Sequence, residues 1–380
     1  GDRILHDFAV ELQEKCQEGV LFCRVTSDHF VGVLKEDSVE DARQAYLTFT
    51  NSFVKRINSR YDQCNLVIAT GLYEITENDW SVSSMMDNAN EARKQCKTQK
   101  VDSAVEIYTD KIRRDLENTR TIVSGMVSAY NNKEFHAYLQ PKVSLHTGKV
   151  VGAEALVRWQ HPQKGFIYPS DFIPVFERSG DICRLDLYVF EEVCAMLAGR
   201  LAQGAPVFPV AVNLSRRHFQ TTDFLQRFAD IRDQYQIRGG LIELELTESI
   251  FFTVGDILNV KEAIRRMHEL GFLCSLDDFG AGFSSLGLLK SFMVDSVKLD
   301  RSFFLDDSQR AHDVVESIVE LARKLGIETV AEGIEAPEQV DFLRSIGCDL
   351  VQGYVYARPM PAEELEAWMR ARHGGEVTQI

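Results

Sequence analysis

"SVKLDRSFFLDDSQRAHDVVESIVELARKLGIETVAEGIE" (residues 296–335) holds two short apolar segments with a longer segment between them. The outer segments, 296–300 and 327–335, are rich in Val and Ile, as β-strands are. The segment 312–326 between them is amphipathic with a helical spacing. A strand, a helix and a second strand in this order predict a crossover connection and a pair of parallel strands.

The same alternation extends over the chain from residue 135 onward. Helices such as residues 186–204 separate most of eight strand-like segments, which are 135–143, 150–159, 207–215, 241–248, 272–279, 296–300, 327–335 and 349–356. Eight strand–helix units in about 240 residues are more typical of a (β/α)8 barrel than of an open doubly wound sheet. We therefore predict an α/β fold, a (β/α)8 TIM-type barrel, preceded by a small α+β module.

Polar residues lie at or near the carboxyl ends of seven strands: Glu154, Asn213, Glu245 with Glu248, Asp277 with Asp278, Lys298, Glu332 and Gln352. In a barrel these ends converge on one face, where active sites of this architecture are built. A single Asp or Glu at such a position is most simply a helix cap or a surface loop residue. Because the placement recurs in seven strands, we predict that these side chains line one pocket.

The predicted pocket combines several carboxylates with an amide oxygen and no His or Cys cluster, a set that suits Mg²⁺ or Mn²⁺ better than zinc. There are more carboxylates than one ion needs as ligands, so we expect two ions. Their charge would offset the repulsion between Asp277 and Asp278. Two-metal sites recur in phosphate-ester hydrolysis, and Lys298 would steady developing negative charge or hold the attacking water. Without metal, mutual repulsion is expected to raise the pKa values of the clustered carboxylates.

Specific motifs follow one another in this region, among them "YLQPKVSLHTGKVVGAEALVRWQHPQKG" (138–165), "DDFGAGFSSL" (277–286), "VKLDRSF" (297–303) and "QGYVYARP" (352–359). Together they make residues from about 135 to 360 resemble the EAL-domain family, the cyclic di-GMP phosphodiesterases. The resemblance implies a barrel with one antiparallel strand. It also implies hydrolysis of cyclic di-GMP to linear pGpG with Mg²⁺ or Mn²⁺, and a homodimer formed through this domain.

The resemblance also implies roles for individual residues. The implied metal ligands are Glu154, Asn213, Glu245, Asp277 and Asp278, with Asp277 between the two ions. Lys298 and Glu332, together with Asp278, match positions that hold or activate the attacking water. The implied substrate-binding positions are Gln140, Leu156, Arg158, Gln352 and Pro359, of which Gln352 matches a water-holding position.

Glu248 resembles a glutamate that anchors the loop "GAGFSSL" (280–286), whose ordering is expected to couple metal binding to dimerisation. Phe283 stands in this loop where the family often has tyrosine. Every catalytic position is filled, which distinguishes the sequence from inactive, ligand-sensing members. A cyclic di-GMP receptor that does not cleave its ligand is the main alternative, and a barrel phosphatase or lyase acting on other phosphate esters is a second.

The first residues resemble the second part of a GGDEF domain, the family that makes cyclic di-GMP. They predict a hairpin within 19–34, a strand within 64–75 and a helix at 81–96. Where the family has Gly-Gly-Asp/Glu-Glu-Phe, this chain has "TSDHF" (26–30). Side chains at Thr26 and Ser27 would block the close approach to phosphates that glycines allow. We therefore predict a degenerate, partial module with a regulatory or dimerising role and no cyclase activity.

The predicted domains are the GGDEF-like module at 1–111, a linker helix at 112–134, the EAL domain at 135–372 and a tail at 373–380. The net charge of -15 argues against binding nucleic-acid polymers. Eight cysteines without a CxxC pair are typical of reduced thiols. No apolar run is long enough to span a bilayer, so we expect a cytoplasmic protein without membrane contact in this segment. An upstream membrane anchor is compatible with the sequence.

Overall fold

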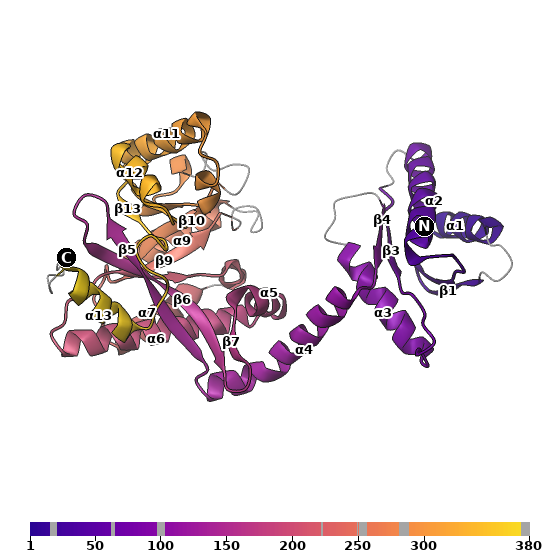
Figure 1. Ribbon diagram of the computed structural model, residues 1–380, viewed down its shortest axis with the longest axis horizontal. Coiled ribbons are helices and arrows are strands. Elements are labelled where there is room, and N and C mark those ends of the chain that lie inside the picture. The colour runs from indigo at the N-terminus through magenta and orange to yellow at the C-terminus, as the bar shows by residue number, and fades with distance from the viewer. Residues whose placement is uncertain are drawn as a thin grey trace. The chain divides into compact units, whose positions relative to one another are not determined.

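The computed structural model describes residues 1–15, 21–61, 65–96, 103–221, 223–248, 250, 257–280 and 289–373 (Figure 1). The chain divides into two compact units, Gly1–Thr121 and Ile122–Ile380. Most of the segment predicted as a linker helix, 112–134, lies in α4, Asp110–Asn131. The predicted ranges of the four domains stay predictions. In the described part of the chain, no helix is both long and apolar enough to cross a bilayer.

The first unit is a small α+β structure. Its elements before α4 are α1 (Asp2–Lys15), β1 (Leu21–Thr26), β2 (His29–Val33), α2 (Val39–Arg60), β3 (Ile68–Leu72), α3 (Val82–Gln95) and β4 (Ser103–Ile107). β1 and β2 form the predicted antiparallel hairpin, and Ser27 in its turn has a left-handed backbone. β3 pairs in parallel with β4, a strand that the sequence analysis did not anticipate. Phe8, Phe49 and Phe53 form the centre of the core.

The second unit is a closed barrel of eight strands. These are β5 (Phe135–Ser144), β6 (Val150–His161), β8 (Val210–Asn213), β9 (Ile242–Thr247), β10 (Leu273–Phe279), β11 (Ser296–Leu299), β12 (Glu328–Ala331) and β13 (Leu350–Val351). The sheet runs from β5 through β13 and back to β6, and pairing of β5 with β6 closes it. β5 is antiparallel to both neighbours, whereas the other barrel strands pair in parallel. The predicted barrel with one antiparallel strand is confirmed.

Helices and one short strand complete this unit. They are β7 (Gly165–Ile167), α5 (Pro169–Ser179), α6 (Ile182–Ala202), η2 (Arg216–Gln220), α7 (Phe224–Gln234), α9 (Ile257–Glu269), η3 (Arg301–Phe304), α11 (Gln309–Leu325), α12 (Pro337–Ser345) and α13 (Ala362–His373). α11 shows how the sequence sets these bounds. The Ser308 hydroxyl accepts a hydrogen bond from Ala311 N at its start, and Gly326 ends it with a φ of 71°. Val315, Val319 and Ala322 bury one face of α11 against the barrel.

The barrel interior is apolar at many positions but carries two buried lysines. Lys142 on β5 and Lys298 on β11 are 3% and 1% exposed. Lys142 pairs with Glu243 on β9, which is not a neighbour of β5 in the sheet. Lys298 pairs with Glu154 on β6, which is not a neighbour of β11. These contacts therefore cross the interior of the barrel. The closed sheet thus brings charged residues from distant parts of the sequence to one place.

Candidate active site

The Lys298 ammonium is the centre of the candidate site. Its Nζ lies 2.7 Å from Oε2 of Glu245 on β9 and 2.7 Å from Oε1 of Glu332, which follows β12. It also lies 3.1 Å from Oδ1 of Asp277 on β10 and 3.3 Å from Oε2 of Glu154 on β6. Four carboxylates that the sequence placed at strand ends therefore meet at one cation.

Burial and charge act against each other in this cluster. Burial alone would lower the pKa of Lys298, but the surrounding carboxylates raise that pKa well above its usual range. Burial raises the pKa of Glu332 to about 8, although Lys298 opposes the change. Burial and the nearby Glu154 raise the pKa of Glu245 well above its ordinary value. Burial also disfavours the charged form of Glu154, but Lys298 and Lys142 outweigh it and lower that pKa to about 2. The expectation of raised pKa values is therefore wrong for Glu154.

A second lysine lies beneath this cluster and was missed by the sequence analysis. Lys142 Nζ lies 2.7 Å from Oε2 of Glu243 and 3.1 Å from Oε1 of Glu245, so Glu245 contacts both lysines. The Ser296 hydroxyl donates to Oε1 of Glu243 at 2.7 Å. The signal was present in the two-residue period of strands, because Glu243 shares a sheet face with Glu245 and Lys142 shares one with Gln140.

The adjacent aspartates lie at the end of β10 in different surroundings. Asp277 is 8% exposed, whereas Asp278 is exposed. Asp278 has a left-handed φ of 55°, and its N–H donates to Oδ1 of Asp277 at 2.9 Å. Aspartate tolerates this backbone region better than most residues. Although Asp278 is partly exposed, the surrounding protein desolvates its carboxylate, and this effect, followed by the charge of Asp277, raises the pKa of Asp278 to about 6.

Amide side chains connect the carboxylate cluster to β5. Asn213 Nδ2 donates to Oε1 of Glu154 at 3.0 Å. Gln352 Nε2 donates to Oε2 of Glu154 and, at 3.2 Å, to Oε1 of Gln140. The Nε2 group of Gln140 donates to Ala357 O at 3.1 Å. Gln352 Oε1 is buried and accepts no hydrogen bond from any residue that the structure describes. A water molecule or a ligand donor would satisfy this oxygen.

The donor set fits a hard divalent cation in type and in charge. Glu154, Asn213, Glu245, Asp277 and Asp278 carry carboxylate or amide oxygens of the type such a cation prefers, and the two lysines do not balance the carboxylates around them. Within the described residues, no three Asp, Glu, His or Cys side chains are arranged to hold one ion as they stand. The carboxylates are directed instead to Lys298. Metal binding would therefore require some of these side chains to turn away from the ammonium.

Two of the predicted substrate-binding residues line a cavity of about 380 Å³ next to the cluster. Leu156 and Arg158 on β6 lie in its wall, and so does Asn213. The Arg158 guanidinium donates to Val157 O at 2.9 Å and lies 5.9 Å from the centroid of the Tyr138 ring. Pro359 lies elsewhere, one residue before Met360, whose backbone pairs with that of Leu139.

The turn after β8 depends on residues that the sequence analysis did not select. Asp186 on α6 is 8% exposed, and its Oδ2 accepts hydrogen bonds from Ser215 N at 2.9 Å and from the His218 ring at 3.0 Å. These bonds hold the chain two residues after Asn213. No sequence motif connected Asp186 to this turn, since the contact spans distant parts of the chain.

Glu248 is 3% exposed and follows β9, where its N–H donates to Asp277 O at 3.2 Å. The predicted loop 280–286 and Phe283 lie outside the described residues except for Gly280. The predicted anchoring of that loop by Glu248 therefore stays a prediction.

Comparisons with known proteins agree with this architecture. The family model described as EAL domain matches residues 126–359. The Pseudomonas aeruginosa protein named cyclic di-GMP phosphodiesterase PA2567 is 36% identical over 253 residues, covering 66% of this chain and 43% of that protein. The oxygen sensor protein DosP of Escherichia coli is 29% identical over 373 residues, covering 97% of this chain and 46% of that protein.

A solved structure of the PaMucR phosphodiesterase in complex with c-di-GMP is also similar. It is 33% identical, with a TM-score of 0.61, and the match covers 64% of this chain and 99% of that one. The chain spans less than half the length of the two curated relatives named above.

Proposed function

This chain belongs to the EAL-domain family, and from that premise we propose that it is a metal-dependent phosphodiesterase that hydrolyses cyclic di-GMP to pGpG. The observation that carries the proposal is the set of four carboxylates around Lys298 at the carboxyl ends of barrel strands. Similarity to a protein named as a cyclic di-GMP phosphodiesterase supports the choice of substrate.

In this proposal, the site would hold two ions of Mg²⁺ or Mn²⁺. Their ligands would be Glu154, Asn213, Glu245, Asp277 and Asp278. Such ions would lower the pKa of a bound water and neutralise charge that develops on the phosphate. Asp277 contributes from the end of β10, where its neighbour Asp278 supplies a more exposed carboxylate. The excess of carboxylates over lysines in this part of the barrel supports the assignment.

The chain's own residues would position and deprotonate the water. Lys298 would orient the attacking water and stabilise negative charge on the phosphate as that charge develops. Glu332 lies 2.7 Å from Lys298 and has a pKa raised to about 8, so its carboxylate is a base able to accept a proton near neutral pH. The unsatisfied Oε1 of Gln352 would accept a hydrogen bond from the same or a neighbouring water.

The remaining assignments concern the substrate. Arg158 would bind a phosphate of the substrate, while Leu156 contributes to the wall of the 380 Å³ cavity. Gln140 would contact the ligand from β5, where its amide already bonds to Gln352. Contact of Pro359 with the substrate is proposed from the family motif alone.

We also propose that the first unit is a degenerate GGDEF-like module with a regulatory role. Ser27 and Asp28 lie in the turn of the β1–β2 hairpin, and the sequence resemblance aligns this turn with the family's glycine-containing motif. A side chain at Ser27 supports loss of cyclase activity. Homodimerisation through the barrel unit and a cytoplasmic location belong to the same proposal.

The test is incubation of purified protein with cyclic di-GMP and Mn²⁺, followed by chromatography of the products. We expect pGpG from the wild-type protein and little from Asp277→Asn, since the amide weakens metal binding. Absence of pGpG at protein concentrations that favour a dimer would refute the proposal. Tight binding of cyclic di-GMP without product would instead favour the receptor that does not cleave its ligand.

A further inference from the structure

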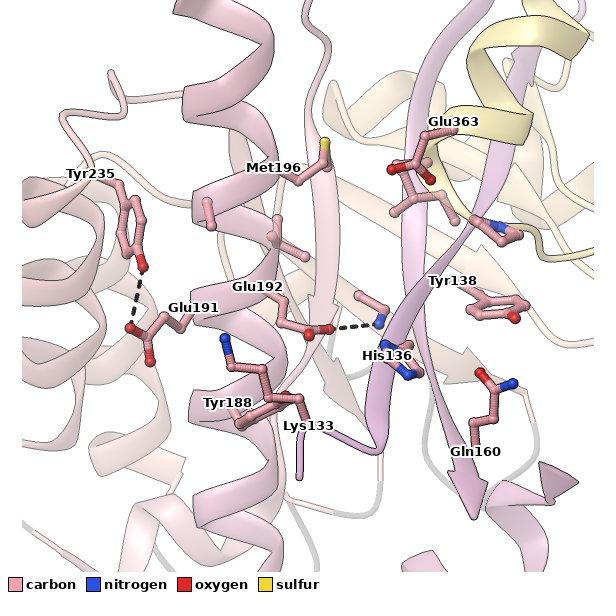
Figure 2. A pocket seen from close by; sticks show the side chains of 16 residues that line it. Lys133, His136, Tyr138, Gln160, Tyr188, Glu191, Glu192, Met196, Tyr235 and Glu363 are labelled. Atoms are coloured by element: carbon pink, nitrogen blue, oxygen red, sulfur yellow. Dashed lines mark hydrogen bonds between the residues drawn. The ribbon is translucent and has the colours of Figure 1, made fainter. Parts of the chain in front are cut away.

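A second cavity, of about 630 Å³, lies on the outer side of the barrel (Figure 2). α6, β5 and the start of α13 form its walls. It shares no lining residue with the 380 Å³ cavity, although α6 contributes to both. Its volume is within the range of about 300–1,000 Å³ that is usual for small-molecule sites. The proposed reaction does not use this cavity.

Aromatic and apolar side chains form part of its lining. Tyr188 on α6 and Tyr235 after α7 contribute aromatic surface, whereas the Tyr138 ring lies on the other face of β5, near Arg158. Leu139 and Met196 supply apolar surface between them. Such a lining offers ring faces and hydrocarbon contact to a ligand with a flat or extended body.

Three carboxylates give the same cavity an excess of negative charge. Glu191 and Glu192 come from α6 and Glu363 from the first turn of α13. Among the lining residues, Lys133 is the one with a fixed positive charge. The acidic groups therefore outnumber the fixed cation, although Lys133 and His136 lie close enough to Glu192 to attract its charge.

Hydrogen bonds hold two of these carboxylates in place. Figure 2 shows Glu192 directed from α6 toward β5, where its Oε2 accepts from Ala137 N at 2.8 Å. Glu191 Oε1 accepts from the Tyr235 hydroxyl at 3.3 Å. Burial raises the pKa of Glu192, with Lys133 and His136 only partly opposing it. A cation that entered the cavity would stabilise the charged form of Glu192.

We propose that this cavity binds a small organic cation that carries a guanidinium group. A guanidinium stacks on tyrosine rings and pairs with carboxylates through two hydrogen bonds, whereas its alkyl chain suits Leu139 and Met196. A metal ion would leave the rings and the apolar surface unused, and an anion would be repelled. The molecule already makes such contacts, since the Arg184 guanidinium lies 4.1 Å from the centroid of the Tyr130 ring.

Isothermal titration calorimetry of the full chain tests the proposal with two probes, agmatine and N-acetyl-arginine amide. We expect saturable binding of one equivalent of at least one probe. Tighter binding of agmatine would indicate a free metabolite, and tighter binding of the amide an arginine within a peptide. Lack of saturable binding by both probes would overturn the proposal.

Three variants distinguish binding in this cavity from nonspecific attraction of a cation to an acidic protein. Glu192→Gln keeps an oxygen for Ala137 N, and Glu363→Gln changes an exposed residue, so both should fold. Each is expected to weaken binding by about tenfold, which corresponds to about 1.4 kcal/mol. Glu316→Gln on α11 removes the same charge from an exposed residue outside the cavity and should leave binding unchanged. Equal weakening by all three variants would contradict the inference.

Discussion

The two lysines in the barrel interior are buried to a similar degree but differ in their surroundings. Lys142 has two carboxylate partners, of which Glu243 is also held by Ser296. Lys298 has four, at the ends of strands that lead to the polar face of the barrel. Burial opposes ionisation of Glu243, yet Lys142 lowers the pKa of Glu243, whereas the pKa of Glu332 beside Lys298 is raised to about 8.

This difference distinguishes a structural ion pair from a candidate active site. Around Lys142 the charges are paired, so the contacts stabilise one arrangement of β5, β9 and β11. Around Lys298 the carboxylates exceed the positive charge, and a buried excess is costly unless a cation binds or protons are retained. We infer that the excess charge, rather than the burial of a lysine, marks the functional part of the interior.

The largest effect is expected from Lys298→Met. Loss of the ammonium removes the group proposed to stabilise the phosphate, and loss of a comparable donor in other enzymes lowers kcat by about 100- to 1,000-fold. Steady-state pGpG formation measures the effect. Turnover within about threefold of wild type would show that Lys298 is as structural as Lys142.

Lys142→Met is expected to act on stability. The substitution leaves Glu243 and Glu245 without their shared cation, and breaking a buried pair in this way costs about 3–5 kcal/mol. Urea denaturation measures the free energy of unfolding. The double variant Lys142→Met/Glu243→Gln should recover part of the loss because it removes the charge of Glu243, which has lost its cation, whereas Glu245 still contacts Lys298. If Lys142→Met alone is as stable as the wild-type protein, Lys142 does not have the structural role that distinguishes it from Lys298.

Metal binding should depend on the carboxylates around Lys298 and not on Glu243 beside Lys142. Mn²⁺ at about 100 times its dissociation constant is expected to stabilise the wild-type protein by about 2.7 kcal/mol, as ligands of the folded state do. Asp277→Asn should lose most of this gain, whereas Glu243→Gln should keep it. Thermal unfolding with Mn²⁺ and with chelator provides the measurement. Loss of the gain in both variants would place the ions between the carboxylates of Lys298 and those of Lys142.

The smallest expected effect is on how the free energy of unfolding depends on pH, measured with a chelator present. Because the folded-state pKa of Glu332 is raised from 4.5 to about 8, its contribution to stability is present below pH 4.5 and is lost as the pH rises toward 8. The pKa of Glu243 is lowered, so its contribution is present above pH 4.5 and is lost as the pH falls. Glu332→Gln should flatten the profile between pH 5 and 8, and Glu243→Gln only at acidic pH. Identical profiles for the two variants would refute this account.

The sequence predicted the eight barrel strands and the residues at their ends because both follow from local periodicity. It did not predict Lys142 and Glu243 as partners, although their two-residue spacing from Gln140 and Glu245 indicated a common face. The meeting of four carboxylates at Lys298 depends on closure of the barrel, which no local pattern encodes. Asp186 was missed for the same reason, since its contacts with Ser215 and His218 join α6 to the turn after β8.

Glu245 contacts both lysines, and this has a consequence for how the barrel folds. Lys142 precedes Glu245 by 103 residues, and Lys298 follows it by 53. During synthesis, the carboxylate therefore emerges after its first partner and before its second. A barrel that lacks β11 would enclose Glu245 with only Lys142, beside the unpaired Glu154. We expect water to remain in the interior until β11 is in place, so that final desolvation of the core is a late, cooperative step of folding.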